Sequence, residues 1–287
     1  MAHFTQLSTT AMIVALCAGS ATAQDAFVGA SIGGLSGTNL NGDQPYSGAT
    51  AVIDGSYGYT FGDYRLIVDG RMRAVDLKVN EVEDLDDNRA DNALFAVHAL
   101  YGMRDNLDLG AFVTGGTANN GDGDGEFALS GYGIEAHYQI NDDFGAYGQI
   151  GGFGAERDAS SPNGTQDGKL IRIGATYNGL ANTSLYADIQ VARAADYEDE
   201  GEDYAFHNIA IGGETMLGGT QLAATYELAF FGTYSIADEG ETDEMRAAEA
   251  SIGIRYYFGN TSAARANGHI GAPSLISESN MWSEFHD

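Results

Sequence analysis

The sequence predicts an all-β fold, a transmembrane antiparallel up-and-down β-barrel of about 12 strands. Three observations indicate this fold. Apolar and polar residues alternate along most of the chain, short turns alternate with long polar loops, and aromatic residues recur at the short-turn ends of the apolar faces. The composition agrees, because Gly makes up 40 of the 287 residues and an interior Gly disfavours a helix by about 1 kcal/mol.

The alternation is clearest in the last strand-like segment. Ala250, Ile252 and Ile254 share one face of an extended chain, whereas Ser251 and Arg255 share the other. A period of two is that of a strand with one apolar face, and about 9–11 residues suffice to cross a bilayer obliquely. Segments with this pattern lie near 26–35, 49–61, 64–78, 92–103, 107–118, 127–140, 144–156, 169–177, 184–196, 204–217, 220–236 and 246–258.

The connections between these segments alternate strictly in length. Transmembrane barrels have this asymmetry, with short periplasmic turns and longer outer loops. The short connections are 62–63, 104–106, 141–143, 178–183 and 218–219, and the long ones are 36–48, 79–91, 119–126, 157–168, 197–203 and 237–245. Acidic residues concentrate in the long set, at 81–87, 198–203 and 238–244, and they predict an acidic outer mouth.

Aromatic residues on the apolar faces give a third, positional signal. Eight of them lie at the short-turn ends of their segments: Phe61, Tyr64, Tyr101, Tyr138, Phe144, Tyr177, Tyr256 and Phe258. Aromatic rings are favoured at a membrane interface, so the pattern predicts one aromatic girdle. Tyr132, Tyr197 and Tyr234, near the long-loop ends, are candidates for the other girdle. The alternative is an ordinary aromatic core of a soluble barrel.

The chain divides into three parts by composition. Residues 1–23 hold an apolar run and a small-x-small cleavage pattern before Gln24, which predicts a secretory signal peptide. Cys17, the only cysteine, lies in this part, so the mature barrel is expected to have no disulfide. Residues 24–259 form the predicted barrel. Residues 260–287 show no alternation and are interpreted as a flexible periplasmic extension, with a lumenal plug or a docking peptide as the alternatives.

Over residues 24–259 the chain resembles the Gram-negative outer-membrane β-barrel proteins, the porin-like group in particular. The stretch from Ile254 to Phe258 is similar to the terminal-strand signal that the outer-membrane assembly machinery reads. The resemblance implies a place in the outer membrane, surrounded by lipid and lipopolysaccharide. A homo-oligomer is equally compatible, because subunit contacts and lipid contacts are both apolar. Barrels of this type usually end at that aromatic, whereas this chain continues from Gly259.

The polar face of each strand is expected to line the lumen, where water or opposite charges solvate ionisable groups. The first two-residue turn sets a register in which Asp54 opposes Arg71. The three-residue turn at 141–143 sets Glu135 opposite Gln149. The predicted pore-lining residues are Asp54, Arg65, Asp69, Arg71, Arg73, His98, Asp108, Glu135, His137, Arg172, Asp188, Glu227, Glu249 and Arg255.

Such a lumen favours a porin-like channel for passive diffusion of small hydrophilic solutes or ions. Twelve strands give a lumen between the filled eight-stranded barrels and the wide sixteen-stranded porins. Small inward residues such as Gly133 and Gly174 leave space and favour a narrow pore. The alternative is a closed structural or adhesive barrel with acidic surface loops, in which the same lumenal charges pair completely.

Other function classes are disfavoured. His207 and Asn208 are adjacent in a strand and therefore point to opposite faces, so they form no catalytic dyad; we assign no catalytic residue and no cofactor. Residues 120–125 match only the start of a calcium-binding loop, because Gly131 stands where that loop needs a bidentate Glu, so no metal ligand is assigned. The net charge of −28 disfavours a nucleic-acid partner.

Two sets of charges compete to determine ion selectivity. The acidic outer loops should raise the local concentration of cations over a Debye length of about 8 Å at 0.15 M salt. Arg65, Arg71 and Arg73, which follow one another on a single face, oppose this effect. Pairing of Arg71 with Asp54 would weaken the arginine strip. The sequence therefore predicts a mild cation preference that fades as salt rises.

Overall fold

In the computed structural model the described residues are 25–38, 45–79, 89–119, 126–156, 166–195, 203–236, 244–258, 270–276 and 278. The signal peptide expected at 1–23 and the acidic clusters of the long loops lie almost entirely outside these ranges. The strands are β1 (Asp25–Thr38), β2 (Pro45–Phe61), β3 (Tyr64–Val79), β4 (Arg89–Arg104), β5 (Leu107–Asn119), β6 (Glu126–Gln139), β7 (Phe144–Glu156), β8 (Gln166–Leu180), β9 (Thr183–Ala195), β10 (Asp203–Met216), β11 (Leu222–Ile236) and β12 (Glu244–Phe258).

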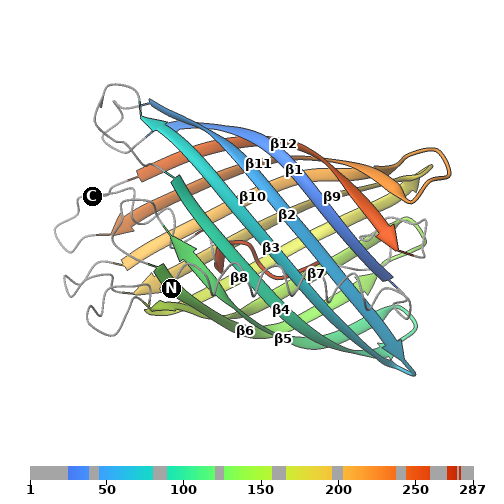
Figure 1. Cartoon of the computed structure of the whole chain (residues 1–287). Helices are drawn as coiled ribbons and strands as arrows, with labels where there is room; N and C mark the ends of the chain where they lie inside the picture. The colour runs from blue at the N-terminus through green and yellow to red at the C-terminus, as the bar shows by residue number, and fades with distance from the viewer. Residues whose placement is uncertain are drawn as a thin grey trace.

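The strands form one closed antiparallel barrel in which each strand pairs with its neighbours in sequence (Figure 1). β12 closes the barrel against β1, with Ile252 opposite Ile32. The predicted fold class and the twelve segments are therefore confirmed. Most strands extend beyond the predicted limits on the long-loop side, as in β2, which begins at Pro45. Backbone pairing continues there beyond the point where the apolar alternation stops.

The registers expected from the short turns are confirmed. Asp54 lies opposite Arg71 across the β2–β3 turn, and Glu135 lies opposite Gln149 across the β6–β7 turn. Gly62 has a φ of 60°, the left-handed conformation that a two-residue hairpin turn requires. The connection expected at 178–183 is shorter in the structure, because β8 continues to Leu180 and leaves a two-residue turn.

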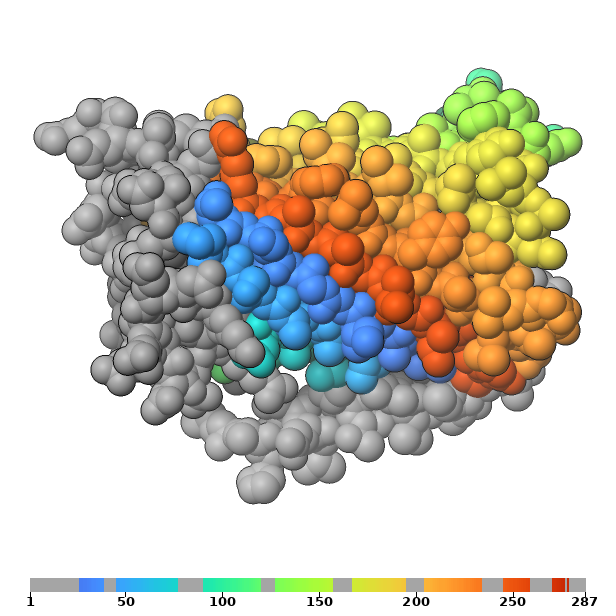
Figure 2. All heavy atoms as spheres, turned by 90° about the horizontal axis from the view of Figure 1, so that it is seen from above, coloured from blue at the N-terminus to red at the C-terminus, as the bar shows by residue number. Residues whose placement is uncertain are grey.

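The outer face of the barrel is apolar. Ile32 and Ile252, which oppose each other on β1 and β12, are each 67% exposed. Figure 2 shows these two strands running obliquely side by side over the outer wall. Large exposed aliphatic side chains recur on every strand, with Ile134, Ile173 and Ile211 among them. A band of this kind is stable against lipid hydrocarbon rather than water, and it identifies a transmembrane barrel of the outer-membrane type.

The predicted aromatic girdle is present at the short-turn end. The rings of Phe61 and Tyr64 stack with centroids 5.6 Å apart, and Tyr64 contacts Tyr101 at 5.2 Å. Phe144 and Tyr177 form a similar pair at 4.7 Å. Of the residues expected in the second girdle, Tyr132 is exposed on the outer face. Tyr197 and the side chain of Tyr234 lie outside the described part of the chain.

No helix in the described ranges has the length and hydrophobicity needed to span a membrane.

The inner face is less uniformly polar than the sequence predicts. Near the long-loop end it carries two clusters of buried apolar side chains. The larger includes Phe112, Phe127, Leu129, Phe153, Leu170 and Phe206, and the smaller includes Leu35, Tyr46, Val75, Phe231 and Met245. The charged residues form a belt across the middle of the lumen. Ionisable groups thus occupy the inward positions in the middle of the strands, whereas many inward positions near the long-loop end are apolar.

The small inward glycines do not leave the open space expected of them. A side chain at Gly133 would meet the ring of Phe112, and one at Gly174 would meet Tyr147 and Asp188. Neighbouring rings therefore fill the volume that the glycines leave. Glycine supports close packing across the inner wall here, rather than a wider pore.

Residues 270–276 and Glu278, called the lumenal segment below, lie inside the barrel (Figure 1). Leu275 and Ile276 are buried in the larger apolar cluster of the inner wall. The sequence interpretation of residues 260–287 as a flexible periplasmic extension, with a lumenal plug or a docking peptide as the alternatives, stays a prediction for the extension as a whole. Leu275 and Ile276, which follow no strand alternation, pack against the apolar inner wall of the barrel.

The outer and inner faces of β12 should respond differently to the same charge. We expect Ile252→Lys to destabilise the barrel in lipid by about 2–4 kcal/mol, because it places an ammonium group near the bilayer midplane. The adjacent Ser251 faces the lumenal cavity. Ser251→Lys is therefore the matched control, and it should lower the free energy of unfolding far less. Urea unfolding in lipid vesicles measures both. Equal losses would contradict the assigned faces.

Candidate functional site

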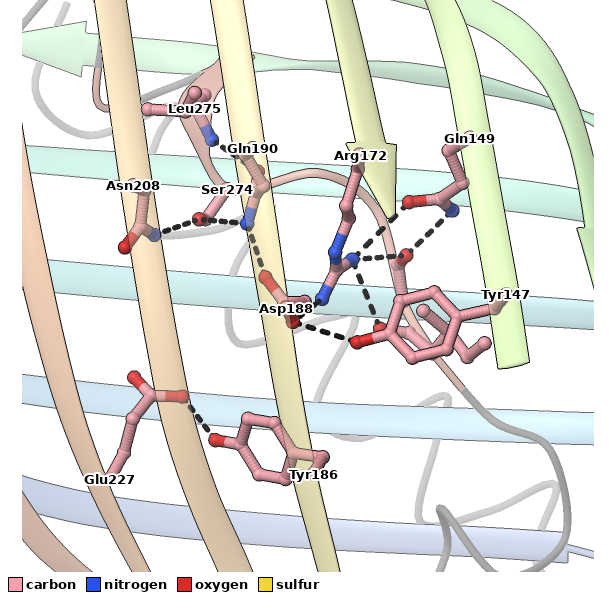
Figure 3. Close-up of polar contacts among 12 residues, drawn as sticks. Tyr147, Gln149, Arg172, Tyr186, Asp188, Gln190, Asn208, Glu227, Ser274 and Leu275 are labelled. Carbon is pink, nitrogen blue, oxygen red and sulfur yellow. Dashed lines mark hydrogen bonds and ion pairs between the residues drawn. The ribbon is translucent and has the colours of Figure 1, made fainter. Parts of the chain in front are cut away.

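The charged belt of the lumen is the candidate functional site, and its best-connected part surrounds Arg172 on β8 (Figure 3). Arg172 Nη2 donates to Asp188 Oδ2 at 2.8 Å, and Tyr147 Oη donates to the same oxygen at 2.8 Å. Gln149 Oε1 accepts from Arg172 Nη1 at 3.2 Å. These residues come from β7, β8 and β9, and all are buried. A buried ion pair is stable only when further hydrogen bonds satisfy it, and this one has them.

A second group surrounds Arg73 on the opposite wall. Arg73 is 1% exposed and forms an ion pair with Glu249 on β12. Thr50 Oγ1 donates to Glu249 Oε1 at 2.7 Å. The ring of Phe231 lies 5.4 Å from the guanidinium carbon. Arg73 is therefore fixed by side chains from β2, β11 and β12.

A third group, toward the short-turn end, surrounds Arg255. Its guanidinium forms ion pairs with Asp54 and with Glu214, the latter at 2.8 Å. Tyr257 Oη donates to Glu214 Oε2 at 2.6 Å. The expected ion pair between Arg71 and Asp54 is therefore corrected. The two residues do oppose each other in register, but the Asp54 carboxylate turns to Arg255 on the far side of β1.

His98 on β4 lies between two carboxylates. Its Nε2 is 2.8 Å from Asp69 Oδ2, and its Nδ1 is 2.9 Å from Glu135 Oε1. Both nitrogens donate only when the ring is an imidazolium. Gln149 Nε2 also donates to Glu135, at 2.9 Å, and His137 lies 3.7 Å from the same carboxylate. With both ring nitrogens facing acids, His98 has no position from which to deprotonate a hydroxyl nucleophile.

The lumenal segment is held at its start by the Arg172 group. Gln149 Nε2 donates to the Gly271 carbonyl at 3.0 Å, and Arg172 Nη1 lies 3.3 Å from the same oxygen. Gln190 Nε2 donates to Ser274 Oγ at 3.1 Å, and the backbone N–H of Leu275 donates to Gln190 Oε1 at 3.3 Å (Figure 3). The amide side chains of Gln149 and Gln190 thus form hydrogen bonds with the backbone of the segment.

The far end of the segment reaches the opposite wall. Glu278 Oε1 lies 3.0 Å from Arg73 Nη1 and 3.6 Å from Arg71 Nη2. Because Arg172 is on β8 and Arg73 is on β3, the segment crosses the lumen from one wall to the other. It divides the lumen at the height of the charged belt.

A cavity of about 190 Å³ remains beside the segment. Ionisable groups dominate its polar lining, which includes seven carboxylates and three guanidinium groups. Tyr186 Oη donates to Glu227, one of these carboxylates. The acids are Asp54, Asp69, Asp188, Glu214, Glu227, Glu249 and Glu278, and the bases are Arg71, Arg172 and Arg255.

Most of the predicted lumenal residues meet in these groups. Arg65 and Asp108 lie nearer the short-turn end, where Arg65 opposes Thr60 and Asp108 opposes His137. Glu214, Tyr147 and Tyr186 were missed as site residues, although their inward positions follow from the same alternation. No periodicity in the sequence predicts the position of Glu278, since its segment follows neither a strand nor a helix pattern. Residues 120–125 lie outside the described part of the chain.

Comparison with known proteins gives structural neighbours only. No protein-family model and no curated protein matches the sequence. Solved structures with similar barrels include the KdgM porin in complex with disordered oligogalacturonate, with 7% identity, a TM-score of 0.46 and coverage of 79% of this chain and 98% of that one. The CymD monoaromatic hydrocarbon channel has 9% identity, a TM-score of 0.48 and coverage of 87% and 93%. The NanC porin has 8% identity, a TM-score of 0.48 and coverage of 79% and 98%. The likeness is one of barrel architecture only.

The belt makes a testable distinction between two of its arginines. We expect Arg172→Ala to destabilise the barrel by about 3–5 kcal/mol, because it leaves Asp188 as an uncompensated buried charge. The side chain of Arg71 is 33% exposed, so Arg71→Ala should lower the free energy of unfolding by about 1 kcal/mol or less. Urea unfolding in lipid vesicles compares the two. A loss at Arg71 as large as that at Arg172 would contradict this assignment.

Proposed function

We propose that the chain is an outer-membrane channel for passive diffusion of small hydrophilic solutes or ions, with a mild preference for cations. The observation that carries the proposal is the charged belt around a cavity of about 190 Å³ inside a wall that faces lipid. Ionisable groups at membrane depth are costly unless they pair or face water, and they mark solute and ion pathways. Both conditions hold in this belt.

The pairing within the belt supports the cation preference. Arg71, Arg73, Arg172 and Arg255 each form an ion pair with at least one carboxylate. Two of the three arginines of the strip that would favour anions, Arg71 and Arg73, are therefore neutralised, and carboxylates outnumber guanidinium groups around the cavity. An excess of fixed negative charge raises the local concentration of cations. The acidic long loops at 81–87, 198–203 and 238–244 would add to it at the outer mouth.

The proposed setting of the channel follows from its outer face. The apolar band would contact outer-membrane lipid and, beyond the long-loop end, lipopolysaccharide. The last strand carries Tyr256 and Phe258, whose rings meet edge to face at 5.0 Å at the short-turn end of β12. We propose this strand as the segment that the assembly machinery reads. The same apolar wall would serve a homo-oligomer.

A closed structural barrel is the second candidate, and one observation favours it. The lumenal segment crosses the lumen, and the inner wall beyond it is lined by apolar side chains. An apolar constriction hinders water and ions. In this alternative the ion pairs of the belt would serve stability alone.

Conductance separates the two candidates. We expect purified protein to produce discrete conductance steps in a planar lipid bilayer and to let small sugars swell liposomes. Heat-modifiable gel migration confirms that the protein has folded and inserted before its conductance is interpreted. Folded, inserted protein without conductance would favour the closed barrel. Turnover of lipid or peptide would instead indicate an outer-membrane enzyme.

Selectivity tests the charge balance. We expect a reversal potential that favours cations at low salt and declines as salt rises, because screening shortens the reach of the fixed charges. Glu227→Gln, which removes one cavity carboxylate, should weaken the preference. Asp105→Asn, in an exposed short turn, is the matched control and should change it less. Anion preference of the unmodified protein at low salt would reject the proposal, and Arg71→Ala would then test the arginine strip.

A further inference from the structure

The lumenal segment brings a carboxylate into the belt that no strand supplies. The Glu278 side chain is 2% exposed and lies between Arg71 and Arg73, at 3.6 Å and 3.0 Å. The two arginines occupy alternate positions on β3, so both point inward from the same wall. They meet the Glu278 carboxylate from one side.

The strands hold Arg73 independently of the segment. Glu249 on β12 forms an ion pair with Arg73, and Thr50 on β2 donates to Glu249. Arg71 projects toward the cavity and retains one third of its side-chain exposure. Withdrawal of Glu278 would therefore leave Arg73 positioned by its remaining partners and Arg71 open to the cavity.

The segment is attached by hydrogen bonds at its start and by apolar packing beyond them. The hydrogen bonds to its backbone and to Ser274 measure 3.0–3.4 Å, and Leu275 and Ile276 are buried in the larger apolar cluster. These contacts do not involve the Glu278 carboxylate. Removal of that carboxylate alone should therefore leave the rest of the segment in place and open the position between Arg71 and Arg73 to a solute.

We propose that Arg71 and Arg73 form a carboxylate-binding site in the lumen, that Glu278 fills it as a tethered ligand, and that a solute carboxylate takes its place when Glu278 is absent or displaced. The inference deepens the proposed channel function and rests on it, since solutes reach the site through the lumen. The ligand class is a carboxylate on a short aliphatic stem, which matches the Glu side chain. Guanidinium groups bind a carboxylate through directed, charge-assisted hydrogen bonds that chloride does not reproduce in the same geometry.

The test is chemical rescue in the full chain. Glu278→Ala removes the tethered carboxylate, and propionate, which has the stem length of the Glu side chain, is the probe. We expect the thermal unfolding midpoint of Glu278→Ala in detergent to rise by a few degrees with millimolar propionate and not with chloride at equal ionic strength. In planar bilayers, Glu278→Ala should move the reversal potential toward anions, and propionate should restore it.

Two controls keep the outcome specific. The double variant Glu278→Ala, Arg71→Ala should lose most of the propionate effect, and the unmodified protein should respond only at much higher propionate. Glu278→Gln fills the site with an uncharged amide, so it should move the reversal potential toward anions and respond little to propionate. If Glu278→Ala does not fold, the yield of folded protein with and without propionate replaces the unfolding midpoint. Rescue that survives in the double variant, or propionate that acts no differently from chloride on Glu278→Ala, would overturn the site. Propionate stabilisation without conductance in any variant would reject the channel and retain the site.

Discussion

The structure depends on one constraint, that the backbone N–H and C=O groups of a chain crossing lipid must be satisfied within the protein. A sheet meets this constraint only when its first and last strands pair, which β1 and β12 do here over nearly their whole length. Closure then divides each strand into an outward and an inward face. The outward faces become apolar because of the lipid, and most ionisable groups at the strand centres lie on the lumenal face.

Confinement explains why the lumenal charges are organised in groups. A guanidinium at this depth needs a carboxylate and further hydrogen bonds, and neighbouring strands supply them at fixed registers. Arg172, for example, receives its partners from the strands on either side of β8. Arg73 instead reaches β12, across β2 and β1, because long side chains span the curved inner wall. Pairing therefore extends beyond the neighbouring strand, which a register alone does not show.

This difference marks how far the sequence is informative. Period-two alternation predicted the twelve strands, the short-turn registers and the inward position of residues such as Arg172 and Glu249. It did not predict that Asp54 would pair with Arg255, because side-chain rotamers and barrel curvature decide that choice. It also gave no place to Glu278, whose position follows from tertiary packing of Leu275 and Ile276. The apolar inner wall near the long loops was missed because alternation separates the inner from the outer face of a strand. It does not tell how polarity changes along the barrel axis.

In the proposed channel, the position of the lumenal segment would determine which charges influence ion selectivity. A solute would pass the outer mouth and the belt in series, so the narrower of the two would have the greater influence on its passage. At the belt, opposite charges stand at ion-pair distance, as Arg172 and Asp188 do at 2.8 Å, well inside the Debye length of about 8 Å at 0.15 M salt. Glu278 adds one negative charge there, beside Arg71 and Arg73, and Arg73 also forms an ion pair with Glu249. A short segment outside the barrel strands thus contributes one of the carboxylates that set the charge balance of the lumenal cavity.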